Sequence, residues 1–277
     1  MERYYSIAGT VIRVVSRSGN PVRMFDGFEC KPAEDVLLTL QVEESGESSL
    51  CSCYGVSHFA CPPGYTHVLF GSSGRGENRL LANEDWSRLL LVGDPSHEMA
   101  WMELLAAAFY SRLTVVGGLL MHASAVKYEG RAVVFTAASG TGKTTQAELW
   151  KKYLQAEILN GDKVFLRPDV HTGTIHAWGS PWCGSSPYAV NDSAEAAAIV
   201  VLAQGRKNEI RRLDPMETLA LFTPHVFFPS WDPTCLERMM GTLDAAAGQI
   251  PVYYLSCLPD AEAVLLTRNR IFGSRGN

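Results

Sequence analysis

The sequence predicts an α/β protein in which a catalytic domain with a phosphate-binding loop follows a small β-rich domain. An apolar strand, a glycine-rich loop and a helix follow one another over residues 131–154, which is the order that a P-loop requires. Near residue 95 the apolar pattern changes from short strand-like runs to helical spacing. The 277 residues suit one large domain or two smaller ones, at roughly 150 residues each. We therefore expect a β-rich recognition or assembly domain over residues 1–94 and the catalytic domain over residues 95–277.

The composition excludes several classes of protein. Hydrophobic residues make up 47% of the chain and charged residues 19%, which is too apolar for an intrinsically disordered protein. A formal net charge of −5 predicts no basic surface for nucleic acid. No apolar run approaches the roughly 18 to 20 residues of a membrane span. Residues 1–5 do not begin a secretory signal. We expect a cytoplasmic protein with no nucleic-acid or membrane partner.

Strand-like runs dominate the first ninety or so residues. Residues 5–8, 11–15 and 36–42 are rich in apolar and β-branched side chains, and Asn-Pro at 20–21 marks a turn. Residues 71–76 are rich in Gly and Ser but lack the GK[ST] ending and the following helix of a phosphate loop. We interpret that run as a hairpin tip.

The seven cysteines are an odd number, and in a reducing compartment we expect free thiols. Cys51, Cys53 and Cys61 form a cluster, with His58 nearby. The second closely spaced pair of a typical zinc site is missing. The pattern therefore favours free thiols over a zinc site.

A helix and two strands are predicted between the change of pattern and the glycine-rich loop. Ser96 is a candidate N-cap for the helix. Residues 119–126 and 131–136 are apolar strands joined by a turn at 128–130. The residues expected on the buried face of the helix are Trp101, Leu104, Leu105, Ala108, Phe109 and Leu113.

The loop after the second strand carries the strongest functional signal. Residues 137–145 read Ala-Ala-Ser-Gly-Thr-Gly-Lys-Thr-Thr. Gly140 and Gly142 allow consecutive backbone N–H groups to turn toward phosphate oxygens. Lys143 would place its ammonium on the outer phosphates, and Thr144 would offer its hydroxyl to magnesium. The motif does not distinguish ATP from GTP, because such a loop contacts only phosphates.

The context of the loop favours phosphate binding over a glycine-rich turn that binds nothing. A helix is predicted over 145–154, with Ala147, Trp150 and Leu154 on one face. The first glycine of the usual pattern is Ala137 here, which we expect to tighten the loop without abolishing binding. The residues expected to contact the nucleotide are Ala138, Ser139, Gly140, Thr141, Gly142, Lys143, Thr144 and Thr145.

A magnesium-dependent P-loop also needs a carboxylate at a nearby strand end. Residues 156–160 are strand-like and lead into Gly161 and Asp162. We therefore predict that Asp162 and Thr144 hold magnesium. The alternative is a structural aspartate in an Asn-Gly-Asp turn.

The segments 122–126, 139–145 and 158–162 together resemble the HPr kinase/phosphorylase family. They are most similar to the HPr-kinase-like serine kinases of peptide-modification gene clusters, including those that phosphorylate lasso peptides. The resemblance spans roughly residues 95–260. It implies a fold related to phosphoenolpyruvate carboxykinase, in which the P-loop lies on a mixed sheet. Weaker likenesses follow at residues 179–185, 198–205 and 208–210.

The resemblance also implies roles for individual residues. Asp162 matches the second member of the family's Asp-Asp pair, which is associated with metal binding and activation of the acceptor hydroxyl. Gly161 stands in place of the first member, so Asp162 would serve alone as the base. His122 matches a histidine ahead of the P-loop strand and would orient a carboxylate beside the phosphates or acceptor; the alternative is a strand histidine satisfied by backbone groups. The catalytic candidates are Lys143, Asp162 and His122.

Two later groups have two interpretations each. Residues 184–186 with Asn191 would close over the acceptor, by family analogy, or form a plain solvated loop. Arg206 or Lys207 would clamp the leaving phosphate, although a surface ion pair is the simpler interpretation of each.

The carboxyl-terminal part is predicted to contain helices at 216–222 and 236–247 and a strand at 252–255. Between the helices lie aromatic residues that would either line a peptide-binding surface or pack in the core, the second being the more usual. These are Phe227, Phe228 and Trp231.

Together these features predict an ATP- and magnesium-dependent kinase that transfers the γ-phosphate to a Ser or Thr hydroxyl of a peptide or small protein. The resemblance suggests peptide natural-product modification, and the hexamers of the family suggest a homo-oligomer. Two alternatives stay open. One is a nucleotide-binding regulatory or scaffold protein without transferase activity, which Gly161 favours; the other is a small-molecule kinase.

Overall fold

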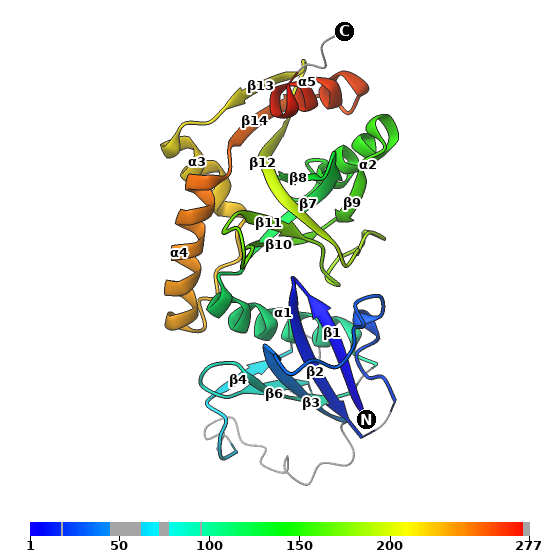
Figure 1. The fold of residues 1–277 in the computed structure, drawn as a ribbon, viewed down its shortest axis with the longest axis vertical. Coiled ribbons are helices and arrows are strands. Elements are labelled where there is room, and N and C mark those ends of the chain that lie inside the picture. Colours follow the sequence, from blue (N-terminus) through cyan, green and yellow to red (C-terminus); the bar gives the residue numbers. More distant parts are fainter. Residues whose placement is uncertain (18, 45–61, 72–77, 95, 274–277) are drawn as a thin grey trace. The chain divides into compact units, whose positions relative to one another are not determined.

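The structure is a computed structural model that describes residues 1–277 except 18, 45–61, 72–77, 95 and 274–277. The chain forms two compact units, Met1–Val115 and Val116–Asn277, and each contains a sheet (Figure 1). The cysteine cluster with His58 and most of the predicted hairpin tip at 71–76 lie outside the described residues.

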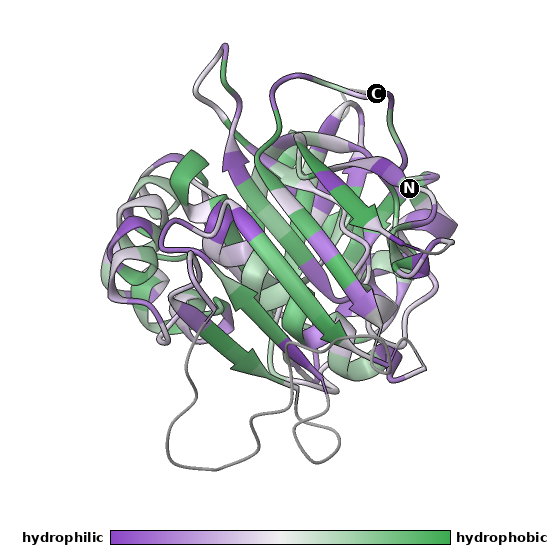
Figure 2. Cartoon of the chain, turned by 90° about the horizontal axis from the view of Figure 1, so that it is seen from below, coloured by the Kyte–Doolittle hydropathy of each residue, from purple (hydrophilic) through white to green (hydrophobic). Residues whose placement is uncertain are grey.

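The first unit is built on a six-stranded mixed sheet with the order β1-β2-β3-β6-β5-β4. Ala8 and Gly9, with φ of 50° and 67°, join β1 and β2 in a two-residue turn of the kind that suits hairpins. Every second residue of β2 is buried, as the alternating side chains of a strand with one face on the core require. Hydrophobic residues run along much of the strands (Figure 2). The strands are β1 (Glu2–Ile7), β2 (Thr10–Ser16), β3 (Leu38–Glu44), β4 (His67–Phe70), β5 (Arg79–Ala82) and β6 (Arg88–Gly93).

Helix α1 (Glu98–Leu113) packs against β5 and belongs to this first unit. Trp101 Nε1 donates to Asn78 Oδ1 at 3.0 Å, and Arg112 Nε donates to the Leu37 carbonyl at 2.8 Å. These contacts explain why the division falls at 115/116 and not at the expected 94/95. The six residues predicted for its buried face are all buried.

The predicted N-cap of α1 is wrong. His97 occupies that position, and its side chain makes no capping hydrogen bond. The amide of Ser96 instead donates to the Asp94 carboxylate at 2.8 Å, which places Ser96 in the preceding turn.

The segment Glu98–Val116 bears on the expectation that no apolar run is long enough to span a membrane. Over its 19 residues it is long and apolar enough to cross a membrane by length and composition. A buried core helix meets the same criteria, and 56% of its apolar window is buried within the structure. It is therefore weak evidence for a membrane span.

The second unit contains an eight-stranded sheet, which is mixed as expected. Its strand order is β11-β10-β7-β8-β12-β14-β13, with β9 beside β7. The pairs β8–β12 and β12–β14 are parallel, and the other pairs are antiparallel. The strands are β7 (Leu119–Tyr128), β8 (Arg131–Thr136), β9 (Glu157–Asn160), β10 (Lys163–Pro168), β11 (Ile175–Trp178), β12 (Ser193–Gln204), β13 (Glu209–Arg212) and β14 (Val252–Cys257).

Helix α2 (Lys143–Leu154) is held on this sheet by an aromatic cluster. Trp150 is fully buried, and its ring lies 5.7 Å from the rings of Tyr128 and Phe135 and 6.4 Å from that of Phe272, on α5 (Ala261–Phe272). The cluster fixes the helix, and therefore the loop that precedes it. The other helices of the unit are α3 (Pro215–Phe222), η4 (Thr223–His225) and α4 (Pro233–Gln249), and η3 (Thr114–Val116) spans the division.

Replacing Trp150 with Ala should remove most of this cluster. We expect Trp150→Ala to lower the free energy of unfolding by about 3 to 5 kcal/mol, as is usual for a buried aromatic residue. Chemical denaturation measures the change. Tyr153→Ala, at a position 42% exposed on the same helix, is the control and should change it by less than about 1 kcal/mol. Equal losses in the two variants would contradict the assigned core.

Candidate functional site

The glycine-rich loop connects the end of β8 to the first residue of α2. Gly140 and Gly142 have φ of 77° and 116°, which side chains other than glycine rarely adopt. No side chain caps the amino terminus of α2 at Gly142. The first N–H groups of a helix carry partial positive charge, so this loop presents a favourable environment for an anion.

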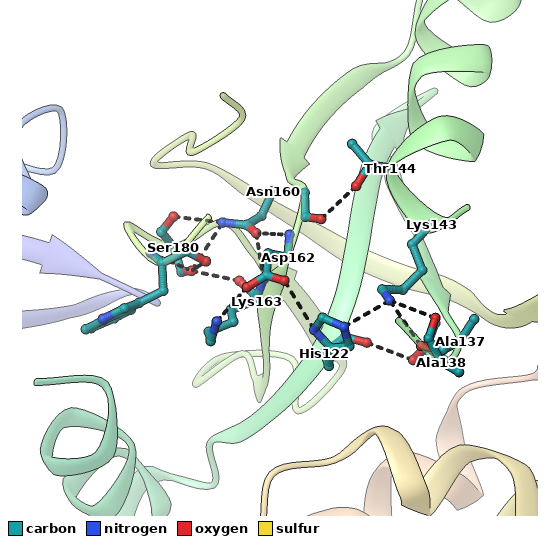
Figure 3. Close-up of polar contacts among 12 residues, drawn as sticks. His122, Ala137, Ala138, Lys143, Thr144, Asn160, Asp162, Lys163 and Ser180 are labelled. Atoms are coloured by element: carbon teal, nitrogen blue, oxygen red, sulfur yellow. Dashed lines mark hydrogen bonds and ion pairs between the residues drawn. The ribbon is translucent and has the colours of Figure 1, made fainter. Parts of the chain in front are cut away.

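The ammonium of Lys143 is folded back onto the loop. Its Nζ donates to the carbonyls of Ala137 at 3.1 Å and Ala138 at 3.4 Å and lies 3.0 Å from His122 Nε2 (Figure 3). Burial lowers the pKa of Lys143, and the Asp162 carboxylate opposes part of that shift. An anion bound beside Lys143 would therefore stabilise its charged form further.

The His122 ring bridges Lys143 and Asp162. Its Nδ1 lies 3.2 Å from Asp162 Oδ1, on the side opposite the contact with Lys143 (Figure 3). The alternative interpretation was a strand histidine satisfied by backbone groups, whereas the His122 ring contacts the side chains of Lys143 and Asp162. The Asp162 carboxylate can only accept, so the Nδ1 that faces it carries a proton. The structure thus brings the three predicted catalytic residues into one chain of contacts.

Asp162 is strongly held as a carboxylate. Its Oδ2 lies 2.5 Å from Lys163 Nζ, and its side chain is 21% exposed. Burial alone would raise the pKa of Asp162, but hydrogen bonds and charge from His122 and Lys163 outweigh it and lower the pKa to about 2. Asp162 is therefore ionised at neutral pH.

The turn that carries Asp162 is built by Asn160, a residue that the sequence analysis did not single out. Asn160 Oδ1 accepts from the amides of Asp162 at 2.7 Å and Lys163 at 2.8 Å. Its Nδ2 donates to the Ser180 carbonyl at 2.8 Å, and the residue is fully buried. Asp162 thus lies in the Asn-Gly-Asp turn offered as its alternative, and it also faces His122. An Asn that ends a strand before Gly is a recognised turn signal.

Of the two predicted magnesium ligands, Asp162 lies in this turn and Thr144 lies beside it. Thr144 Oγ1 donates to the Gly161 carbonyl at 3.1 Å. Magnesium prefers a few oxygen ligands, with water and phosphate completing its shell. A hydroxyl and an ionised carboxylate fit that preference, although Asp162 must share its oxygens with His122 and Lys163. Among the described residues no cluster of three His, Cys, Asp or Glu side chains could hold a metal ion.

Gly184 lies against Asp162, and Ser186 lies against Gly161. The closure of residues 184–186 with Asn191 over an acceptor stays a prediction. A Cβ added at Gly184 would lie 2.9 Å from Asp162 Cγ. A Cβ added at Gly161 would lie 2.0 Å from Ser186 Oγ and 2.5 Å from Ser186 Cβ. The backbone at 161 therefore has no room for a second carboxylate while Ser186 keeps its place.

The segment after α3 contributes His225, which the sequence analysis did not name, and Phe227, for which it left two interpretations open. Phe227 N donates to the Leu120 carbonyl at 2.9 Å, and the Phe227 ring lies 6.0 Å from Lys163 Nζ. Burial, followed by the charges of Lys143 and His122, lowers the pKa of His225. The core interpretation of the aromatic residues is wrong, because Phe227, Phe228 and Trp231 are 37%, 37% and 40% exposed.

Neither predicted phosphate clamp joins the contacts around Asp162. Lys207 is 74% exposed and forms an ion pair with Glu209, and Arg206 is exposed. Lys207 is thus the surface ion pair of the simpler interpretation.

No family model and no curated protein matches the chain. Among solved structures it is similar to the Hpr(Ser) kinase/phosphatase from Coxiella burnetii, with a TM-score of 0.33 and 12% identity, over 55% of this chain and 97% of that chain. A likeness this distant decides nothing about activity, so the function has to be inferred from the residues of the site.

Crowding at Gly161 is testable by a pair of substitutions. We expect Gly161→Ala to lower the free energy of unfolding by about 1 to 3 kcal/mol, because the new methyl group overlaps Ser186. Adding Ser186→Gly should restore part of the loss, measured as a coupling energy in a double-mutant cycle. The control, Gly241→Ala on α4, meets open space and should not destabilise. Additive effects at 161 and 186 would contradict the contact.

The ion pairs of Asp162 should make stability depend on pH in metal-free protein. The folded-state pKa of about 2 lies below the ordinary 3.8, so the stabilisation is present above the ordinary value and is lost as the pH falls toward 2. We expect Asp162→Asn to cost about 2 kcal/mol near neutral pH and about half of that near pH 3. Denaturant unfolding in EDTA measures this difference. Exposed Asp244→Asn is the control, and a cost for Asp162→Asn that does not change with pH would contradict the assignment.

Proposed function

We propose that the protein is an ATP- and magnesium-dependent phosphotransferase that moves the γ-phosphate to a Ser or Thr hydroxyl of a peptide or small protein. The observation that carries this proposal is the chain of contacts from Lys143 through His122 to Asp162, beside the amino terminus of α2. It combines a cation for phosphates, free helix N–H groups and an ionised carboxylate in one place. Phosphoryl transfer needs mainly such positioning and electrostatic stabilisation.

In this proposal the loop amides at 138–145 bind the phosphates, and Lys143 exchanges its carbonyl contacts for a phosphate oxygen. Thr144 and Asp162 are the residues that would hold magnesium. The chemistry that the metal supplies when bound is neutralisation of phosphate charge. His122 keeps the Asp162 carboxylate oriented through its Nδ1 contact.

The low pKa of Asp162 refines its role. A general base works best when its pKa is close to the working pH, and a carboxylate with a pKa of about 2 is a weak proton acceptor at neutral pH. We therefore assign Asp162 to binding the metal and orienting the acceptor hydroxyl, more than to removing its proton. Catalysis then depends on charge and alignment.

A peptide or small protein is the acceptor that the surroundings favour. The Phe227 ring lies beside Lys163, which contacts Asp162, and Phe227 is 37% exposed. An aromatic edge next to a polar centre suits an apolar side chain flanking a Ser or Thr. A cytoplasmic location and a homo-oligomer stay predictions.

A second candidate is a nucleotide-binding regulatory protein that transfers nothing. The crowded backbone at Gly161 favours it, because a second carboxylate has no room there. Such a protein would bind ATP through the same loop and respond with a change of shape or partner.

Nucleotide binding should depend on Lys143 and on magnesium. With ATP at about a hundredfold excess over Kd, binding adds about 2.7 kcal/mol of stability. The melting temperature of wild type should then rise by about 5 to 10 °C with magnesium and less in EDTA. Lys143→Ala should abolish the rise, whereas the control Lys152→Ala, exposed on the same helix, should keep it.

Transfer is then measured with γ-labelled ATP and a library of Ser- and Thr-containing peptides. Labelled peptide in wild type but not in Lys143→Ala supports the kinase. A Lys143-dependent thermal shift with no transfer supports the regulatory alternative. No shift in wild type would overturn both.

A further inference from the structure

We propose that His225 accepts the proton of the acceptor hydroxyl in the phosphoryl transfer, from a position beside His122 on the face of the sheet that carries the candidate site. This inference rests on the proposed function and adds to it a general base, a role that Asp162 does not fill. His225 lies at the end of η4, in the segment that follows α3.

Strand pairing sets the position of His225. Val226 forms an antiparallel bridge with Met121 of β7, and in this register His225 stands opposite His122. Residues opposite each other in an antiparallel pair project from the same face of the sheet. On its other side β7 pairs with β10, where Lys163 is opposite His122. The His122 side chain therefore has His225 as its neighbour on one side and Lys163 on the other.

His225 and Phe227 project from the same side of their segment. Val226, between them, has an extended backbone and is 6% exposed, so its side chain points into the core. Side chains alternate along an extended segment, which places His225 and Phe227 on the face opposite to Val226. The Phe227 ring lies 6.0 Å from Lys163 Nζ, and this face is therefore the one that carries the candidate site. The segment presents an imidazole and an aromatic ring to the same space.

The charges that act on His225 agree with this position. Burial lowers the pKa of His225, and the charges of Lys143 on α2 and His122 on β7 lower it further. Lys163 and Asp162, which form an ion pair, lie on the far side of His122. Lys143 is the residue expected to hold the outer phosphates, so His225 lies within electrostatic range of the group to be transferred.

The other two candidates for a proton acceptor are already engaged. His122 faces Asp162 with Nδ1 and Lys143 with Nε2, and Asp162, with a pKa of about 2, is a weak acceptor at neutral pH. The ring of His225 is partly exposed and makes no hydrogen bond with another described residue. Its lowered pKa keeps it neutral near pH 7, with a lone pair on one ring nitrogen.

The proposed step balances as follows. The hydroxyl oxygen forms a bond to the γ-phosphorus while the bond from that phosphorus to the bridging oxygen of ATP breaks, and ADP leaves with the electron pair. The hydroxyl proton passes to the neutral nitrogen of His225, which later releases it to water. The negative charge of bound ATP offsets the charge of Lys143, so it raises the pKa of His225 and makes the ring a stronger base when the nucleotide is present.

The first test follows transfer from γ-labelled ATP to a peptide that wild type phosphorylates. We expect His225→Gln to lower kcat about 10²- to 10⁴-fold, the usual contribution of a general base, and to keep the ATP-induced rise in melting temperature. The ratio of wild-type kcat to variant kcat should approach one as the pH falls below the pKa of His225, because a protonated ring accepts no proton. His171→Gln, at an exposed turn, is the control and should keep the wild-type rate and pH profile.

Chemical rescue separates a proton acceptor from a merely structural residue. Imidazole added to His225→Ala should restore part of kcat, because it supplies a base in the space that the side chain has left. Imidazole should not restore Lys143→Ala, which lacks a charge for the phosphates. Absence of rescue, together with a loss in His225→Gln that does not change with pH, would overturn the proposal.

A second readout needs no activity. NMR titration of the His225 ring in wild type should give a pKa below the ordinary 6.5. ATP with magnesium should raise this pKa, and Lys143→Ala should raise it in the free protein, because each change reduces the positive charge beside the ring. The ATP titration uses wild type and does not depend on the folding of a variant. A pKa that responds to neither change would place His225 away from Lys143 and overturn the proposal.

The outcomes separate the inference from the function on which it rests. If wild type phosphorylates a peptide in a Lys143-dependent way but His225→Gln keeps its kcat, the assignment of the base is wrong and the proposed function stands. If wild type phosphorylates no peptide, the proposed function fails and the inference fails with it.

Discussion

The antiparallel pairing of β7 with β9 and β10 is the constraint on which the candidate site depends. The register places Lys163 opposite His122, and Ala123 N donates to the Asp162 carbonyl at 2.9 Å. The turn that carries Asp162 is thereby held against the middle of β7. From there the His122 ring spans the gap to Lys143, on a different part of the chain. A shift of one residue in this pairing would turn His122 to the other face of the sheet.

The site satisfies its own charges through internal contacts. Lys143 contacts two carbonyls and His122, and Asp162 contacts His122 and Lys163. A phosphate that binds Lys143, or a metal ion that binds Asp162, must therefore displace existing contacts. This requirement lowers affinity and favours ligands that provide new partners for both the lysine and the carboxylate. A nucleotide with magnesium does so, because it supplies an anion for the lysine and a cation for the carboxylate.

The loop borders two features of the second unit. The first is the set of contacts around Asp162, which joins an ionised carboxylate to the Lys143 ammonium through His122. The second is a cavity that is lined by 140–142 and by residues at the carboxyl ends of β12 and β14. Crowding at Gly161 limits the turn beside His122 to a single carboxylate.

The sequence by itself determined the strand–loop–helix unit over 131–154 and the buried face of α1. It also determined those strands that are short, continuous apolar runs, because all of these features follow from residue type and spacing. It did not predict β4, β5, β6, β10, β11 or β13 individually, nor the order of strands in either sheet, because strand pairing joins residues far apart in the chain. The three catalytic candidates came from motifs, but their contacts depend on the pairing of β7. Only the tertiary structure placed Ser186 against Gly161 and the Ser180 carbonyl against Asn160, because packing between distant segments decides which groups have room and which have partners.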